Sequence, residues 1–252
     1  MEGVLILNHD NRKIINYKSS IQYNTIQYNT IQSIILTQSA LHFLRVLLII
    51  HNNSVFLGTY DYGNAFYSFD YGLVKTIVLS SYSDTRRGSN QYNWLLNELK
   101  HIDRRATPWL VVMMHTQFYT TFKGHNEEEE TVVMREAMEG LFREYQVNLV
   151  FSGHDHAYMR SLPMFHGKVD ASGKSPIYMI VGEGGNRESH VKNYVHEDPE
   201  DWVGVRDKSV YGFGTMEFVN ETHANWKWIM DGNTGEKFED DVWFEHQYLQ
   251  KI

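Results

Sequence analysis

The sequence predicts an α/β fold that ends in an antiparallel β segment. From about Ser54 onward, short apolar runs typical of buried strands alternate with amphipathic helical segments. Several of these runs end directly in histidine or glycine. Beyond Tyr211 the hydrophobic period changes to two, which is typical of antiparallel strands. We therefore expect one main α/β sheet followed by a mainly β region.

The first predicted strand and helix follow each other closely. Val74–Ser81 is an apolar run of strand length. Ser89–Lys100 carries Trp94, Leu95 and Leu99 at helical spacing, and the hydroxyl of Ser89 is suited to cap the first N–H groups of a helix. This pattern predicts a strand followed by a helix that buries one face.

A second strand and helix follow in the same order. Trp109–Met114 is a buried strand by composition, and it stops at His115. Glu127–Tyr145 opens with acidic residues, which favour a helix N-terminus. The apolar face expected for this helix consists of Val133, Ala137, Leu141 and Tyr145.

Two further buried strands complete the predicted sheet. Asn148–Ser152 runs into Gly153-His154-Asp155-His156, and Ile177–Val181 ends in the glycine loop Gly182–Asn186. We interpret this loop as a strand-end turn, because it lacks the lysine of a P-loop and the glycine spacing of a dinucleotide site.

The last part of the chain, residues 211–252, is predicted to be mainly β. Trp226, Trp228 and Met230 alternate on one face, and residues 232–235 read as a turn. We expect the two tryptophans in the core and His223 beside a nearby turn.

The chain divides into two parts of unlike composition. Residues 1–53 form an atypical, low-complexity segment with a tandem IQYNT repeat at residues 21–30. Residues 54–252 hold all the strands and helices described above. We assign no function to the first part.

Composition excludes several classes of function. The 252-residue chain is 42% hydrophobic, enough for a core, and its net charge of −8 is opposite in sign to that of nucleic-acid-coating proteins. The absence of cysteine excludes disulfides, Cys-ligated zinc and thiol nucleophiles. The apolar run Leu41–Ile50 is half as long as the roughly 20 residues of a membrane helix. We expect no nucleic-acid partner, no membrane span and no clear signal peptide.

Histidines stand at the ends of two predicted strands. His115 follows one strand, His154 and His156 follow another, and Gly153 lets the backbone leave the strand sharply. Because ligands collect at the carboxyl ends of strands in open α/β sheets, these side chains are candidates for one metal site. The alternative is chance, since 13 histidines make a Gly-His-x-His string unremarkable.

Seven strings along the chain resemble the purple acid phosphatases, within the calcineurin-like metallophosphoesterases, in that family's order. The resemblance covers about residues 54–252 and implies a metallophosphoesterase-type β-sandwich flanked by helices. The strings are Phe66–Asp70, Leu79–Tyr82, Gln91–Leu95, Thr107–His115, Val150–Tyr158, Gly182–Asn186 and Asn220–Ala224.

The resemblance implies an acid phosphatase that hydrolyses small phosphate monoesters with a dinuclear metal centre, Fe(III) paired with Zn, Mn or Fe(II). His115 and His154 would bind the divalent ion, and His156 the ferric ion. His125 would contact the substrate, hydrogen-bonding the phosphate or protonating the leaving oxygen. A bland alternative for His125 is an exposed loop histidine.

The sequence also departs from the family pattern. No Gly-Asp-x-Gly or Gly-Asp-x-x-Tyr string occurs, and Asn8-His9-Asp10 is only partly similar to the third metal motif. Met159 stands where the family usually has glutamate. The N-terminal part of the domain is therefore expected to be missing or replaced. A catalytically inactive fragment or binding module is the alternative function, and a phosphodiesterase is a weaker one.

The remaining signals have simple interpretations. Glu127–Glu130 is expected to be a solvated first helical turn. Asn52 and Asn220 lie in N-glycosylation sequons. The family resemblance implies a secreted or vacuolar glycoprotein.

Overall fold

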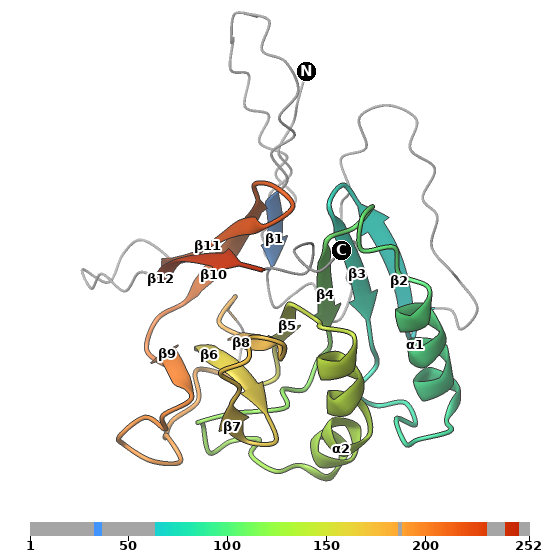
Figure 1. Ribbon diagram of the computed structural model, residues 1–252. Helices are drawn as coiled ribbons and strands as arrows, with labels where there is room; N and C mark the ends of the chain where they lie inside the picture. Colours follow the sequence, from blue (N-terminus) through green and yellow to red (C-terminus); the bar gives the residue numbers. More distant parts are fainter. Residues whose placement is uncertain (1–32, 37–63, 186–187, 231–239, 247–252) are drawn as a thin grey trace, which may run out of the picture. The chain divides into compact units, whose positions relative to one another are not determined.

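The computed structural model describes residues 33–36, 64–185, 188–230 and 240–246 (Figure 1). All of them belong to one compact unit, Ile31–Ile252. The IQYNT repeat, the apolar run at 41–50, Asn8-His9-Asp10, Asn52, Asn186 and the predicted turn at 232–235 lie outside these residues.

The described strands form two sheets. In the larger sheet the order is β2-β3-β4-β5-β8-β6-β7, and β9 also pairs with β6. Strands β3, β4, β5 and β8 are parallel, and they are the four buried strands that the sequence predicts. The bounds are β2 Tyr67–Tyr71, β3 Val74–Val78, β4 Trp109–Met113, β5 Leu149–Ser152, β6 Tyr158–Phe165, β7 Lys168–Val169, β8 Ile177–Val181 and β9 Val203–Asp207.

Two helices cross between the parallel strands. Helix α1 spans Asn90–Lys100, and the Ser89 hydroxyl accepts a hydrogen bond from the Tyr92 N–H at 3.1 Å, as a capping residue should. Helix α2 spans Glu129–Glu144. Neither these helices nor any other in the described ranges has the length and apolar character to cross a membrane.

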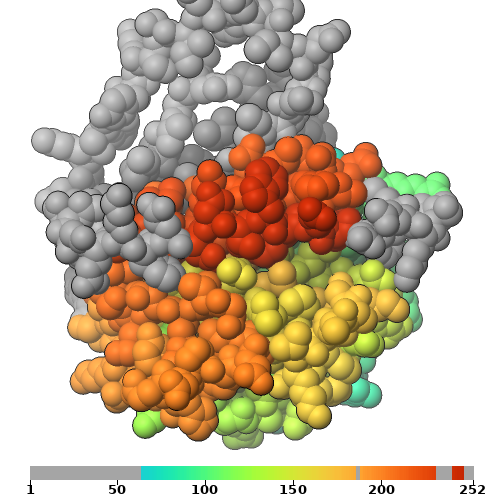
Figure 2. Space-filling model, turned by 60° about the vertical axis from the view of Figure 1, so that its left-hand side comes forward, coloured from blue at the N-terminus to red at the C-terminus, as the bar shows by residue number. Residues whose placement is uncertain are grey.

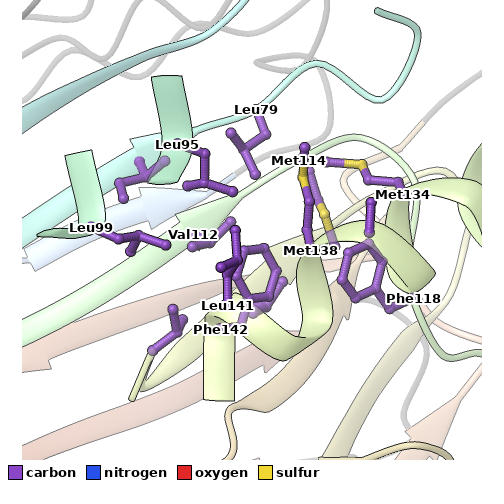
Figure 3. Packing of buried hydrophobic residues seen from close by; sticks show 14 of the residues in the cluster. Leu79, Leu95, Leu99, Val112, Met114, Phe118, Met134, Met138, Leu141 and Phe142 are labelled. Atoms are coloured by element: carbon purple, nitrogen blue, oxygen red, sulfur yellow. The ribbon is translucent and has the colours of Figure 1, made fainter. Parts of the chain in front are cut away.

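One face of the large sheet packs against both helices (Figure 3). Leu110 and Val112 of β4 point to this side and meet Leu95 of α1 and Met138 and Phe142 of α2 in one buried cluster. The buried face of α2 is thus rotated from the predicted one. Ala137 and Leu141 are buried as expected, whereas Val133 and Tyr145 are only partly buried.

The other face of the large sheet packs against the second sheet. This sheet is antiparallel, in the order β1-β10-β11-β12, with β1 Ser33–Leu36, β10 Gly212–Phe218, β11 His223–Met230 and β12 Asp240–Glu245. Because side chains alternate along a strand, Trp109 and Val111 of β4 face this sheet, opposite to Leu110. The predicted sandwich flanked by helices is confirmed.

The two tryptophans predicted for the core lie between the sheets. Trp226 and Trp228 are fully buried, and the Trp226 ring occupies the space where a Cβ at Gly214 would lie. The predicted turn is present beside His223, whose N–H donates to Asn220 Oδ1 at 2.8 Å.

A buried polar network also connects the sheets. The Tyr158 hydroxyl on β6 donates to Asp240 on β12 at 2.6 Å, and Arg160 donates to both oxygens of the same carboxylate. The Trp226 indole N–H donates to Tyr158. In Figure 2 the red residues of β12 border yellow residues of the larger sheet.

Candidate metal and substrate site

The candidate site lies at the carboxyl ends of neighbouring parallel strands. His115 follows β4 and His154 follows β5, and their ring centroids are 4.7 Å apart. The Gly153 N–H donates to the His115 carbonyl at 3.0 Å, which holds the two loops together. The strand order therefore brings together two histidines that are far apart in sequence.

Backbone conformation at His154 is unusual. Its φ is 56°, in the left-handed region that non-glycine residues rarely adopt. Glu127, directly before the N-cap residue of α2, has a similar φ of 61°. Such conformations persist where surrounding contacts hold them, and they often occur at functional sites.

Glu128 connects His125 to His154. Its Oε1 lies 2.7 Å from His125 Nδ1, and its Oε2 lies 2.9 Å from His154 Nε2. The rings of His125 and His154 lie 3.8 Å apart. We call His115, His125, Glu128 and His154 the imidazole cluster.

The expectation that Glu127–Glu130 forms a solvated first helical turn is therefore wrong for Glu128. This residue is the N-cap of α2, but its carboxylate does not cap the helix. It is turned toward the imidazoles of His125 and His154 instead. Glu127 and Glu129 are exposed, as expected.

Protonation in the imidazole cluster suits metal binding. Burial lowers the pKa of His154, against the opposite effect of its bond to Glu128, and so favours the neutral imidazole that a metal requires. Burial alone would raise the pKa of Glu128, but the hydrogen bonds from His125 and His154 hold that pKa below its usual range. The carboxylate is therefore charged.

His156 points to a different part of the site. Its Nδ1 lies 3.0 Å from the Ser189 carbonyl, and its Nε2 lies 3.9 Å from the Glu188 carboxylate. His156 and His125 both line a cavity of about 290 Å³, which Lys123 also borders. The cavity therefore connects His156 to the imidazole cluster.

The loop after β8 adds a buried acid near His156. Glu183 has no exposed surface, and His190 Nδ1 lies 2.7 Å from its Oε2. Burial raises the pKa of Glu183 to about 9. The loop packs tightly here, because a Cβ at Gly182 would lie 1.9 Å from the Asp155 carbonyl oxygen. We call His156, Glu183 and His190 the β8 side.

A buried carboxylate fixes the loops of the site relative to each other. Asp155 is fully buried, and its Oδ2 accepts hydrogen bonds from Gln117 Nε2 at 3.0 Å and from the Thr120 hydroxyl. Gln117 and Thr120 belong to the loop between His115 and His125. Sequence patterns did not identify Asp155, Gln117 or Glu128. The His-x-x-Glu spacing just before a helix is a signal for Glu128.

The residues present fit one divalent ion. His125, Glu128 and His154 offer ligand atoms within 4.8 Å of one another, and two imidazoles with one carboxylate are typical ligands of zinc. No second group of three such residues occurs within the described ranges. His156 alone therefore does not provide the oxygen-rich ligand set that suits a ferric ion. Met159, at the position where glutamate was expected, is fully buried among apolar residues.

Two protein families match the chain. The calcineurin-like phosphoesterases match residues 8–158, and the iron/zinc purple acid phosphatase-like C-terminal family matches residues 175–241. Together these matches include strands of both sheets, and they leave out residues 159–174.

Curated plant proteins are similar over most of the chain. The probable purple acid phosphatase 20 of Arabidopsis thaliana is 39% identical over 71% of this chain and 41% of its own length. The Fe(3+)-Zn(2+) purple acid phosphatase 12 of the same plant is 33% identical over 72% of this chain and 40% of its own length. The chain thus spans about two fifths of these relatives.

A solved structure has the same fold. The purple acid phosphatase PPD1 from yellow lupin (Lupinus luteus) seeds matches with a TM-score of 0.64 at 22% identity, over 73% of this chain and 33% of that one.

Proposed function

Because the chain belongs to the calcineurin-like phosphoesterases and, within them, to the purple acid phosphatases, we propose that it is a metal-dependent acid phosphatase acting on small phosphate monoesters. The observation that carries this proposal is the imidazole cluster at the ends of β4 and β5. It combines three imidazoles, a charged carboxylate and an adjoining cavity.

A divalent ion would be held by His154 and Glu128, with His115 beside them, and His125, the third residue of the group, would be left for the substrate. The chemistry that such an ion supplies is Lewis-acid polarisation of the phosphate ester and a lowered pKa of water. Lys123 and Lys192 line the adjoining cavity and attract the anionic substrate.

His125 would act on the substrate directly. Its Nδ1 is held by Glu128 Oε1, which fixes the ring and leaves Nε2 to hydrogen-bond the phosphate or protonate the leaving oxygen. No protein nucleophile is needed in this scheme, since water attacks phosphorus.

Metal analysis and turnover test the proposal. We expect the purified full chain to retain about one divalent ion per molecule. We also expect it to hydrolyse p-nitrophenyl phosphate at pH 5. A preparation with neither bound metal nor turnover would contradict the proposal.

One observation favours a non-catalytic alternative from the same family. Within the described ranges only the imidazole cluster can hold an ion, and His156 has no comparable carboxylate partner. A chain that binds one Zn²⁺ ion but turns over no substrate would support a binding module instead.

A secreted or vacuolar location and glycosylation are part of the proposal. Asn220 is exposed at the turn between β10 and β11, where a glycan can project. A mass loss on glycosidase treatment that is smaller in Asn220→Gln than in the parent chain would support this, and an unchanged mass in both would oppose it.

A further inference from the structure

A second cavity borders His125 without bordering His156. Its volume is about 500 Å³, and its walls include Gln117, Thr131 and Trp202. Cavities of about 300–1,000 Å³ are typical of small-molecule sites. A phosphate bound at His125 therefore has room beside it for the organic part of an ester.

Two residues that line this cavity each carry a buried polar atom without a hydrogen-bond partner within the described part of the chain. These atoms are Oε1 of Gln117, a residue 1% exposed, and the hydroxyl of Thr131, a residue 3% exposed. Gln117 Nε2 already donates to Asp155, so Oε1 is the amide atom left for a ligand. An unpaired buried polar atom is costly, and a ligand hydroxyl group would satisfy it.

The charge around this cavity opposes a second negative group on the ligand. Glu127 and Glu136 are exposed on its wall, and Glu139 is buried there. The cation among them, Arg135, is already occupied, since it donates to the Phe118 carbonyl at 2.6 Å and contacts Glu127 at 3.2 Å.

We propose that the cavity beside His125 binds the alcohol part of the substrate and selects neutral, hydroxyl-bearing alcohols such as sugars and glycerol. The inference rests on the proposed function, which places the phosphate at His125. Gln117 Oε1 accepts from one ligand hydroxyl, and Thr131 exchanges a hydrogen bond with another. The acids on the cavity wall disfavour alcohols that carry a carboxylate.

Thr131→Val is the principal test, because it removes the hydroxyl and keeps the shape. We expect the ratio of kcat/KM for glucose 6-phosphate to kcat/KM for p-nitrophenyl phosphate to fall about tenfold. Thr131→Ser, which keeps the hydroxyl, should preserve the ratio. An unchanged ratio in Thr131→Val would overturn the proposal.

A binding measurement separates this inference from the proposed function. Affinities of the metal-loaded full chain for glucose 6-phosphate and for inorganic phosphate are measured by calorimetry, which needs no turnover. If p-nitrophenyl phosphate is not hydrolysed, the phosphatase assignment fails. The proposed alcohol-binding role of the cavity beside His125 still stands if glucose 6-phosphate binds more tightly than phosphate and Thr131→Val removes the difference. Equal affinities of the parent chain for glucose 6-phosphate and for inorganic phosphate would overturn this alcohol-binding role alone.

A matched pair of substrates tests the charge argument. Glycerol 3-phosphate and 3-phosphoglycerate have the same carbon skeleton, but the second carries a carboxylate. We expect glycerol 3-phosphate to have the higher kcat/KM, or the higher affinity where there is no turnover. A preference for the carboxylate would overturn the selectivity for neutral alcohols.

Discussion

The imidazole cluster and the β8 side lie at the same edge of the sheet but differ in the state of their carboxylates. Glu128 is charged because two histidines hold it, whereas Glu183 is buried and its pKa is raised to about 9. The first carboxylate can stabilise a cation, and the second is largely protonated at neutral pH. Histidine content alone therefore does not make a metal site. The position of the neighbouring acid also matters, since three ligand atoms lie within 4.8 Å of one another in the imidazole cluster.

The largest expected difference between the two regions is in Zn²⁺ affinity. His154→Ala removes a member of the imidazole cluster and should weaken Zn²⁺ binding about 100-fold or more, since even outer contacts of a metal site contribute 10–100-fold. His156→Ala should change the affinity by less than about fivefold. Titration calorimetry of the two variants measures both. Equal losses would remove the distinction between the regions.

A smaller effect is expected from Glu128→Gln. The substitution keeps the shape and removes the charge that holds His125 and His154, so Zn²⁺ affinity should fall about 10–30-fold. Glu129→Gln is the matched control, because Glu129 is the next residue, also acidic, and is exposed. A similar loss in both variants would mean that general negative charge, rather than Glu128, attracts the ion.

The smallest effect is expected on the β8 side, and it depends on pH. The folded-state pKa of Glu183, about 9, exceeds the ordinary glutamate value of 4.5. The contribution of the protonated Glu183 to the free energy of unfolding is therefore fully present below pH 4.5. It is lost as the pH rises toward 9. Glu183→Gln removes that loss and should raise Tm by about 3 °C at pH 8, with little change at pH 4.5.

Thermal unfolding at the two pH values measures this effect. A variant that is destabilised at pH 8 would mean that Glu183 acts as a charged partner of His190. That result would make the β8 side resemble the imidazole cluster.

Much of the fold follows from local patterns, because burial of one face imposes a period that the sequence displays. Trp94, Leu95 and Leu99 are buried on α1 as predicted, and Trp226 and Trp228 lie in the core. The buried face of α2 differs from the predicted one because the sheet and the neighbouring loops both pack against this helix. The buried surface is therefore wider than the single stripe that the sequence pattern predicts.

The site was only partly predictable, for a physical reason. The strand-end rule places His115 beside His154, but only the His-x-x-Glu spacing from His125 distinguishes Glu128 from three neighbouring glutamates, and that spacing alone does not show a contact. Its role depends on the bend at Glu127, which aims one side chain of the run inward. The metal roles of His115, His154 and His156 and the substrate role of His125 stay predictions.

The buried contacts of Asp240 set a practical limit on how short an expressed fragment can be. A fragment that ends anywhere between β11 and β12 lacks this acid. The Arg160 guanidinium and the Tyr158 hydroxyl, which both donate to it, would then lose that acceptor. Tyr158 is two residues beyond His156, so damage at the last strand would reach the loop that carries the histidines. A fragment intended to preserve that loop should extend at least through Glu245.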